Sequence, residues 1–216
     1  MIASLIYIVF SYLCGSILFA RVAMLLFGKQ HILADSKDNN PGTANAFMHG
    51  GFFPGVFTLL GDLLKGFLPV HLLIQYGPAE PSFLMLTLVL AAPVLGHAFP
   101  VFFHLEGGKG IATTFGCLLG LLPFWQPLLC FAFSFILLST VIRISPHFQR
   151  TAAAYLLAIT LMLFFSQPMP VILGFMLIAL VVSVRLLMSK EHREKTQVYL
   201  LWFKILGEDE ETHKIA

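Results

Sequence analysis

Hydrophobic residues occur in long runs along this chain, and short polar or proline-containing stretches separate the runs. A helix that crosses a bilayer needs about 20 mostly apolar residues. The first three runs and the last come close to that length, and the other three are shorter, which fits little tilt or a locally thinned bilayer. The runs are Met1–Phe27, Gly55–Gln75, Ser82–Phe103, Ile111–Leu122, Leu128–Ile142, Thr151–Phe165 and Val171–Leu187. The pattern predicts an all-α integral membrane protein with about seven transmembrane helices.

The breaks between the runs differ in charge, and this difference predicts the topology. The stretches 76–81, 123–127 and 166–170 contain proline but neither lysine nor arginine, so we interpret them as turns on one side. The other side then holds Lys29, Lys37, Lys109, Arg143, Arg150, Lys190, Arg193, Lys195, Lys204 and Lys214. Basic residues concentrate in cytoplasmic loops. We therefore expect an N-terminus outside, a C-terminus in the cytoplasm, a transmembrane bundle over 1–188 and a cytoplasmic tail over 189–216. The first run is expected to be a retained span, not a signal peptide.

The composition agrees with a membrane protein and excludes an ordinary soluble domain. The chain is 58% hydrophobic and 11% charged, and its mean hydropathy is +0.87, whereas soluble domains carry about 25% charged residues. The net charge of +2 gives no indication of nucleic-acid binding, and we expect none. The three cysteines lie singly in apolar runs, which is typical of inert buried thiols, and no metal or other cofactor is expected.

Four polar clusters fall on the predicted cytoplasmic face, and the first is the loop over residues 35–45. Its Asn, Asp and Gly residues tolerate left-handed backbone and expose amide groups that can bind hydroxyls and phosphate oxygens. The simpler interpretation is a turn followed by a helix N-cap, and spacing alone favours it. The second cluster contains Asp62 and Lys65, three residues apart on one helix face within an apolar run. A structural ion pair is the favoured role, and direct catalysis is the alternative.

The third cluster runs from Gly96-His97-Ala98-Phe99-Pro100 to a glycine-rich stretch of Gly107, Gly108, Lys109 and Gly110. Successive glycine amides can form a concave anion-binding nest, and Lys109 and the start of the next helix add positive charge. The spacing is not that of a Walker A loop. A flexible turn is the simpler interpretation, but the lysine among three glycines favours an anion site. For His97 two interpretations remain: a member of the site, or a hydrogen-bonded histidine at the membrane interface.

The fourth cluster, residues 190–195, follows the last apolar run and by itself resembles a basic flank at the membrane surface. The apolar stretch 198–206 after it is expected to lie on the membrane surface. Taken together, the residues predict a cytoplasmic site that holds phosphate groups beside an acyl-chain environment. Chemistry on a lipid phosphate fits this combination.

The sequence resembles the bacterial acyl-phosphate-dependent glycerol-3-phosphate acyltransferase family, in order along most of the chain. The most specific stretch is Gly96–Phe102 followed by Gly107–Thr113, and Leu60–Gly66 and His192-Arg193-Glu194 are also similar to family motifs. The resemblance implies seven spans in the bacterial inner membrane with the active site on the cytoplasmic face. It also implies transfer of an acyl group from acyl phosphate to the 1-hydroxyl of glycerol 3-phosphate, which gives lysophosphatidic acid for phospholipid synthesis. Acyl-CoA is not needed.

The chain departs from the family pattern mostly where the acceptor would bind. Asn40, Gly42 and Asn45 match the family's first loop, whereas Asp38 replaces a Ser, Ala44 a Thr, Met48 an Arg, and Lys195 an Asn. An aspartate repels a phosphate, and the loss of an arginine removes a bidentate partner. Three functions therefore remain: the family reaction, acyl transfer to a different acceptor, or non-catalytic binding of an anionic lipid.

The resemblance also implies roles for individual residues. Lys109 and the amides of Gly107, Gly108 and Gly110 would hold the leaving phosphate, and Asn40 and Asn45 would orient the acceptor. His192 would bind the acceptor phosphate or deprotonate its hydroxyl, and Asp38 is the other candidate base. Gly42 and Lys195 are further candidate phosphate-binding positions. The expected partners are acyl phosphate, glycerol 3-phosphate or a related acceptor, and membrane lipids.

Overall fold

The computed structural model describes residues 2–29, 40–189, 196–201 and 203–206, most of which are helical. Each of the seven predicted apolar runs contains a helix, because apolar side chains of a buried or lipid-facing helix leave its backbone to satisfy its own hydrogen bonds. The longer helices are α1 (Ile2–Gly15), α2 (Phe19–Leu26), α4 (Phe52–Tyr76), α5 (Phe83–Ala98), α6 (Ile111–Leu119), α7 (Gln126–Ile136), α8 (His147–Phe164) and α9 (Met169–Met188). Short helical turns complete them: α3 (Thr43–Asn45), η1 (Ala46–Gly50), η2 (Val101–Phe103) and η3 (Leu137–Val141).

Helix length separates clear membrane spans from shorter helices. Among the described residues, three helices are long and apolar enough to cross a membrane, namely 52–76, 83–103 and 169–188. The pair α1 and α2, bent by 44°, would make a fourth. Helix α6 has nine residues and rises only about 13 Å, which is less than half of a hydrocarbon core of about 30 Å. The count of seven crossings therefore stays a prediction, although all seven runs are helical.

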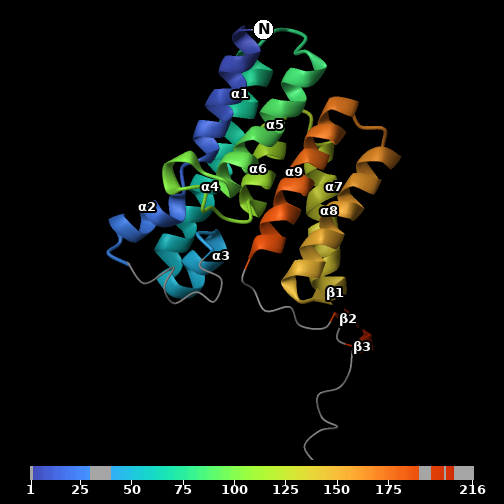
Figure 1. Ribbon diagram of the computed structural model, residues 1–216. Helices are drawn as coiled ribbons and strands as arrows, with labels where there is room; N and C mark the ends of the chain where they lie inside the picture. The colour runs from blue at the N-terminus through green and yellow to red at the C-terminus, as the bar shows by residue number, and fades with distance from the viewer. Residues whose placement is uncertain (1, 30–39, 190–195, 202, 207–216) are drawn as a thin grey trace, which may run out of the picture.

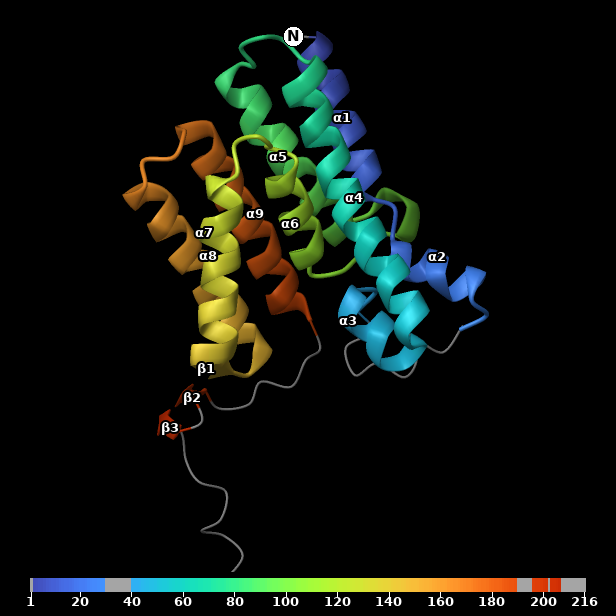
Figure 2. The same ribbon diagram turned by 180° about the vertical axis from the view of Figure 1, so that it is seen from behind.

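The two ends of the bundle carry different connections. The α4–α5 and α8–α9 connections lie toward the end where the chain begins, and α2 and α3 lie toward the other end (Figures 1 and 2). The predicted turns without lysine or arginine at 76–81 and 166–170 therefore share one end. The compartment that each end faces remains a prediction from the positive-inside rule.

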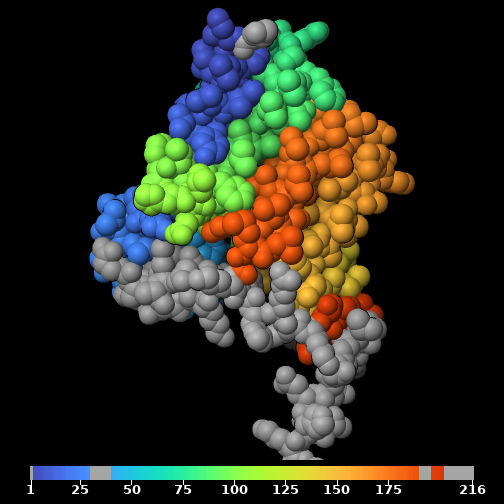
Figure 3. All heavy atoms as spheres, in the orientation of Figure 1, coloured from blue at the N-terminus to red at the C-terminus, as the bar shows by residue number. Residues whose placement is uncertain are grey.

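Close helix packing positions the site. Helices α4 and α6 approach at two glycines: a Cβ on Gly66 would lie 2.3 Å from the Thr113 carbonyl oxygen, and one on Gly116 would lie 2.1 Å from the Leu63 carbonyl oxygen. Small residues allow such contacts, and packing of this kind holds helices together in lipid. On the outer surface of the bundle, the segment that contains η2 and precedes the glycine loop lies exposed between α2 and α9 (Figure 3). Its side chains Val101 and Phe102 are exposed. These outward apolar side chains suit a lipid-facing surface.

A small sheet is a departure from the purely helical fold that we expected. Strands β1 (Ile142–Ser145), β2 (Gln197–Leu200) and β3 (Phe203–Leu206) form an antiparallel sheet in the order β1-β2-β3. The expectation that residues 198–206 lie on the membrane surface stays a prediction. Strand β2 pairs with β1, in the register Arg143 to Tyr199, and β3 pairs with the other edge of β2. Strand pairing satisfies backbone donors and acceptors that a lone segment would leave to solvent.

Candidate active site

One cavity of about 1060 Å³ brings the first three predicted polar clusters together. Its polar wall includes Asn40, Gly42, Asn45, Asp62, Lys109 and Gly110. Its apolar wall is made by Leu59, Leu63, Ile111, Phe115, Leu119, Leu128 and Phe135. A cavity with a few convergent polar groups and a long apolar wall is typical of a site for an amphiphilic ligand.

The glycine loop is a buried, hydrogen-bonded structure, so the interpretation as a flexible turn is wrong. Residues Gly107 to Gly110 are buried, with Lys109 only 8% exposed. Arg185 on α9 donates two hydrogen bonds to the Gly107 carbonyl oxygen, from Nε at 3.1 Å and from Nη2 at 2.5 Å. Gly110 has φ of +79°, which glycine adopts without strain. Its carbonyl oxygen accepts from the Thr114 hydroxyl at 2.9 Å.

This arrangement corrects one predicted contact. The amide of Gly108 donates to the His97 carbonyl oxygen at 3.0 Å, so it serves the fold and does not point at a ligand. Gly107 does not line the cavity, whereas Lys109 and Gly110 do. The two earlier glycines therefore shape the loop because their positions exclude side chains: a Cβ on Gly107 would collide with the His97 carbonyl oxygen.

The first loop folds over the cavity. The side-chain amide of Asn45 donates to the Asn40 carbonyl oxygen at 2.9 Å, which closes the turn before α3. Gly42 is the N-cap residue of α3 and makes no side-chain cap. Asn40 reaches the glycine loop, because its Oδ1 lies 3.1 Å from where a Cβ on Gly108 would stand. The turn and the cavity wall are thus made by the same residues.

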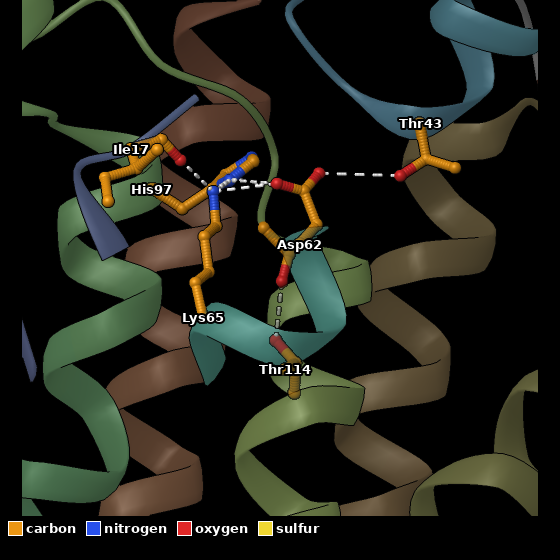
Figure 4. Close-up of polar contacts among 7 residues, drawn as sticks. Ile17, Thr43, Asp62, Lys65, His97 and Thr114 are labelled. Atoms are coloured by element: carbon orange, nitrogen blue, oxygen red, sulfur yellow. Dashed lines mark hydrogen bonds and ion pairs between the residues drawn. The ribbon is translucent and has the colours of Figure 1, made fainter. Parts of the chain in front are cut away.

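A buried charged cluster lies below the two loops (Figure 4). Lys65 Nζ lies 2.8 Å from Asp62 Oδ1, which confirms the predicted structural ion pair. Lys65 also donates to the Ile17 carbonyl oxygen at 2.8 Å and lies 2.6 Å from His97 Nδ1. Thr43 of the first loop donates to Asp62 Oδ2 at 3.5 Å. His97 is 2% exposed and lines the cavity, so it is a buried residue of the cavity wall.

Sequence reasoning missed three polar residues on the other side of the cavity. Ser139 in η3, and His147 and Arg150 in the first turn of α8, line it opposite the first loop. Arg150 resembles an ordinary basic residue at the end of a span, so its position carried no distinguishing signal. Arg185 was also missed, since a basic residue near the end of the last helix is expected in any membrane protein.

Three predicted site residues, Asp38, His192 and Lys195, lie outside the described residues. Within the described ranges, no group of three or more His, Cys, Asp or Glu side chains is arranged to hold a metal ion. The three cysteines are free thiols, with Cys117 and Cys130 buried and Cys14 partly buried.

Comparison with known proteins identifies the family. The model of the glycerol-3-phosphate acyltransferase family matches residues 5–200. Glycerol-3-phosphate acyltransferase from Actinobacillus pleuropneumoniae serotype 5b is 44% identical over 117 residues, which cover 53% of this chain and 56% of that protein. The Yersinia pestis (strain Pestoides F) enzyme is 44% identical over 115 residues, 51% of this chain and 50% of its own. The chain thus matches about half the length of these curated relatives.

Two solved structures extend the likeness to most of the fold. Both are crystal structures of PlsY (YgiH), an integral membrane glycerol 3-phosphate acyltransferase, and both are 28% identical to this chain. The glycerol 3-phosphate form has a TM-score of 0.69, and the match covers 89% of this chain and 96% of the chain in that structure. The lysophosphatidic acid form has a TM-score of 0.67, and the match covers 84% of this chain and 87% of the chain in that structure. With its apolar helices, the chain is a multi-pass membrane protein that belongs to the glycerol-3-phosphate acyltransferase family.

Proposed function

We propose that this protein transfers an acyl group from acyl phosphate to the 1-hydroxyl of glycerol 3-phosphate. The hydroxyl oxygen attacks the acyl carbon, the bond from that carbon to the phosphate oxygen breaks, and inorganic phosphate leaves with the electron pair. Acyl phosphate is a mixed anhydride and is already activated, so the protein needs mainly to position the reactants and to stabilise charge. The products are lysophosphatidic acid and phosphate.

The observation that carries this proposal is the cavity, which joins a cationic glycine loop to an apolar wall. Lys109 and Gly110 at one end suit the phosphate of the donor. Phe115, Leu119 and Phe135 extend from there and suit its acyl chain. The solved relative with glycerol 3-phosphate and lysophosphatidic acid forms supports the same acceptor and product here. The site would then face the cytoplasm at the bacterial inner membrane.

The acceptor would bind between the first loop and α8. Asn40 and Asn45 would orient its hydroxyl groups, with Gly42 shaping the loop. Met48, which stands where the family has an arginine, lines this cavity and is 68% exposed. Arg150 lines the same cavity from α8, so a guanidinium is present for the acceptor phosphate, although from another helix. His192 and Lys195 would complete the phosphate contacts, and His192 or Asp38 would accept the hydroxyl proton.

The test is release of inorganic phosphate by the purified protein from palmitoyl phosphate, with and without glycerol 3-phosphate. We expect release to require the acceptor, lysophosphatidic acid to form in equal amount, and Lys109→Ala to lower the rate about 10- to 150-fold. Lys29→Ala, at an exposed position after α2, is the matched control. Release that ignores glycerol 3-phosphate would indicate a different acceptor, or water. No release under any condition would overturn the proposal in favour of anionic-lipid binding.

A further inference from the structure

His97 lies below the glycine loop, buried among charged groups that the proposed reaction does not use. It is the penultimate residue of α5, is 2% exposed, and lines the same cavity as Lys109. Its two ring nitrogens face different surroundings. Nδ1 faces the Asp62–Lys65 pair, whereas Nε2 faces Gly108. Which nitrogen carries the proton therefore decides what His97 can do at the cavity.

Lys65 determines the proton position. An ammonium group has three N–H donors and no acceptor. Lys65 Nζ has three partners at hydrogen-bonding distance: Ile17 O at 2.8 Å, Asp62 Oδ1 at 2.8 Å and His97 Nδ1 at 2.6 Å. Since Lys65 can only donate, Nδ1 accepts, and the proton of the neutral imidazole is on Nε2.

The proton on Nε2 faces the loop that carries the phosphate site. A Cβ on Gly108 would lie 2.2 Å from Nε2, so only glycine allows the imidazole this close to the loop. Asn40 Oδ1 approaches the same point, at 3.1 Å. Lys109 follows Gly108 directly in the chain, and His97, Asn40 and Lys109 all line the same cavity.

We propose that His97 is a neutral hydrogen-bond donor whose Nε2–H binds a phosphoryl oxygen of the acyl phosphate, and that Lys65 and Asp62 are positioning residues that hold it in this tautomer. The inference rests on the proposed function for the identity of the ligand. It also excludes His97 as the base for the acceptor hydroxyl, because neither ring nitrogen has a lone pair available in this arrangement. The Asp62–Lys65 pair thus acts on the reaction without touching the substrate.

Two amide substitutions separate the ring nitrogens. The side-chain oxygen of His97→Asn can replace Nδ1 as acceptor for Lys65, but nothing replaces the donor at the cavity. The longer side chain of His97→Gln can place an amide N–H near the Nε2 position. We expect His97→Asn to lower kcat/KM for palmitoyl phosphate about 10- to 100-fold, and His97→Gln to retain most of the activity. Equal activity of His97→Asn and wild type, at equal thermal stability, would overturn the inference, as would loss in His97→Gln alone.

A spectroscopic measurement tests the positioning role even where a variant is inactive. In the ¹⁵N NMR spectrum of the labelled wild-type protein, the His97 signals should show a protonated Nε2 and an unprotonated Nδ1. In the double variant Asp62→Asn with Lys65→Met, which leaves no unpaired charge behind, the tautomer preference should be lost and kcat should fall. An unchanged tautomer in that variant would refute the role of Lys65, since a purely structural pair would alter stability alone.

Binding of a non-hydrolysable alkyl phosphonate distinguishes this inference from the proposed function. Titration calorimetry on the wild-type protein should show binding that His97→Asn weakens about 10-fold or more and His97→Gln preserves. If the wild type binds the phosphonate in this way but transfers no acyl group, the proposed function fails and the role of His97 stands. If the phosphonate binds equally to all three proteins, the donor role of His97 is wrong whatever the reaction.

Discussion

Replacing Gly108 with alanine places a methyl group between the glycine loop and the His97 imidazole. The added carbon would lie 2.2 Å from His97 Nε2, whereas ordinary contact begins at 3.4 Å, so the two must separate by 1.2 Å. The imidazole cannot simply rotate away, because Lys65 holds its other nitrogen at 2.6 Å. The loop cannot retreat easily either, because its Gly107 carbonyl oxygen is bound by Arg185. The displacement therefore falls on the site.

The expected magnitude has two parts. Overpacking of a buried position costs about 1–3 kcal/mol of stability. Misplacement of a catalytic group by about 1 Å can cost about 100-fold in rate. We therefore expect Gly108→Ala to lower kcat for lysophosphatidic acid formation about 100-fold. The free energy of unfolding should fall by only about 1–3 kcal/mol. The assay is radiolabelled glycerol 3-phosphate incorporation, with thermal unfolding in detergent measured on the same preparation.

Two further variants control this experiment. Gly28→Ala adds a methyl group with no heavy atom within 4 Å, at φ of +65°, so it carries backbone strain of about 1–2 kcal/mol without a collision. It should leave kcat unchanged. In a His97→Ala background, Gly108→Ala should cost much less stability than in the wild type, because the colliding atoms are gone. Full activity of Gly108→Ala would refute the reasoning from the His97 contact. An equal loss of stability in the wild-type and His97→Ala backgrounds would refute it as well.

Three other changes test the rest of the site. Arg150→Met should raise KM for glycerol 3-phosphate about 10-fold or more and leave KM for palmitoyl phosphate unchanged; the exposed Arg143→Met is the control, and equal effects would remove Arg150 from the acceptor site. Arg185→Met removes both hydrogen bonds to the Gly107 carbonyl oxygen and should lower kcat about 10-fold in steady-state assays. An unchanged kcat would mean that the glycine loop keeps its shape without Arg185. In Gly66→Ala the added Cβ would lie 2.3 Å from the Thr113 carbonyl oxygen, so α4 and α6 must separate and the unfolding temperature should fall. Calorimetry in detergent measures this temperature, and an unchanged value would contradict the close packing.

Local patterns determined the helices and the motif. Apolar runs predicted where helices form, since length and hydropathy are properties of consecutive residues. The three-residue spacing of Asp62 and Lys65 predicted their ion pair, because side chains three apart share a helix face. Gly96–Phe102 and Gly107 to Gly110 carried the resemblance to the family, because a motif is a property of consecutive residues, and the anion site expected there stays a prediction. These inferences required no knowledge of which helices are neighbours.

The tertiary structure decided the contacts between residues distant in the chain. The Gly108 amide is used by His97 O, and Arg185 holds Gly107 from 78 residues away. Arg150 faces the cavity because α8 packs across from the first loop, which the basic flank of a span does not reveal. The sheet of β1 with β2 forms for the same reason, since pairing depends on the partner that folding brings near. Hydropathy and spacing describe single segments, whereas a site is a relation between segments, and only helix packing sets that relation.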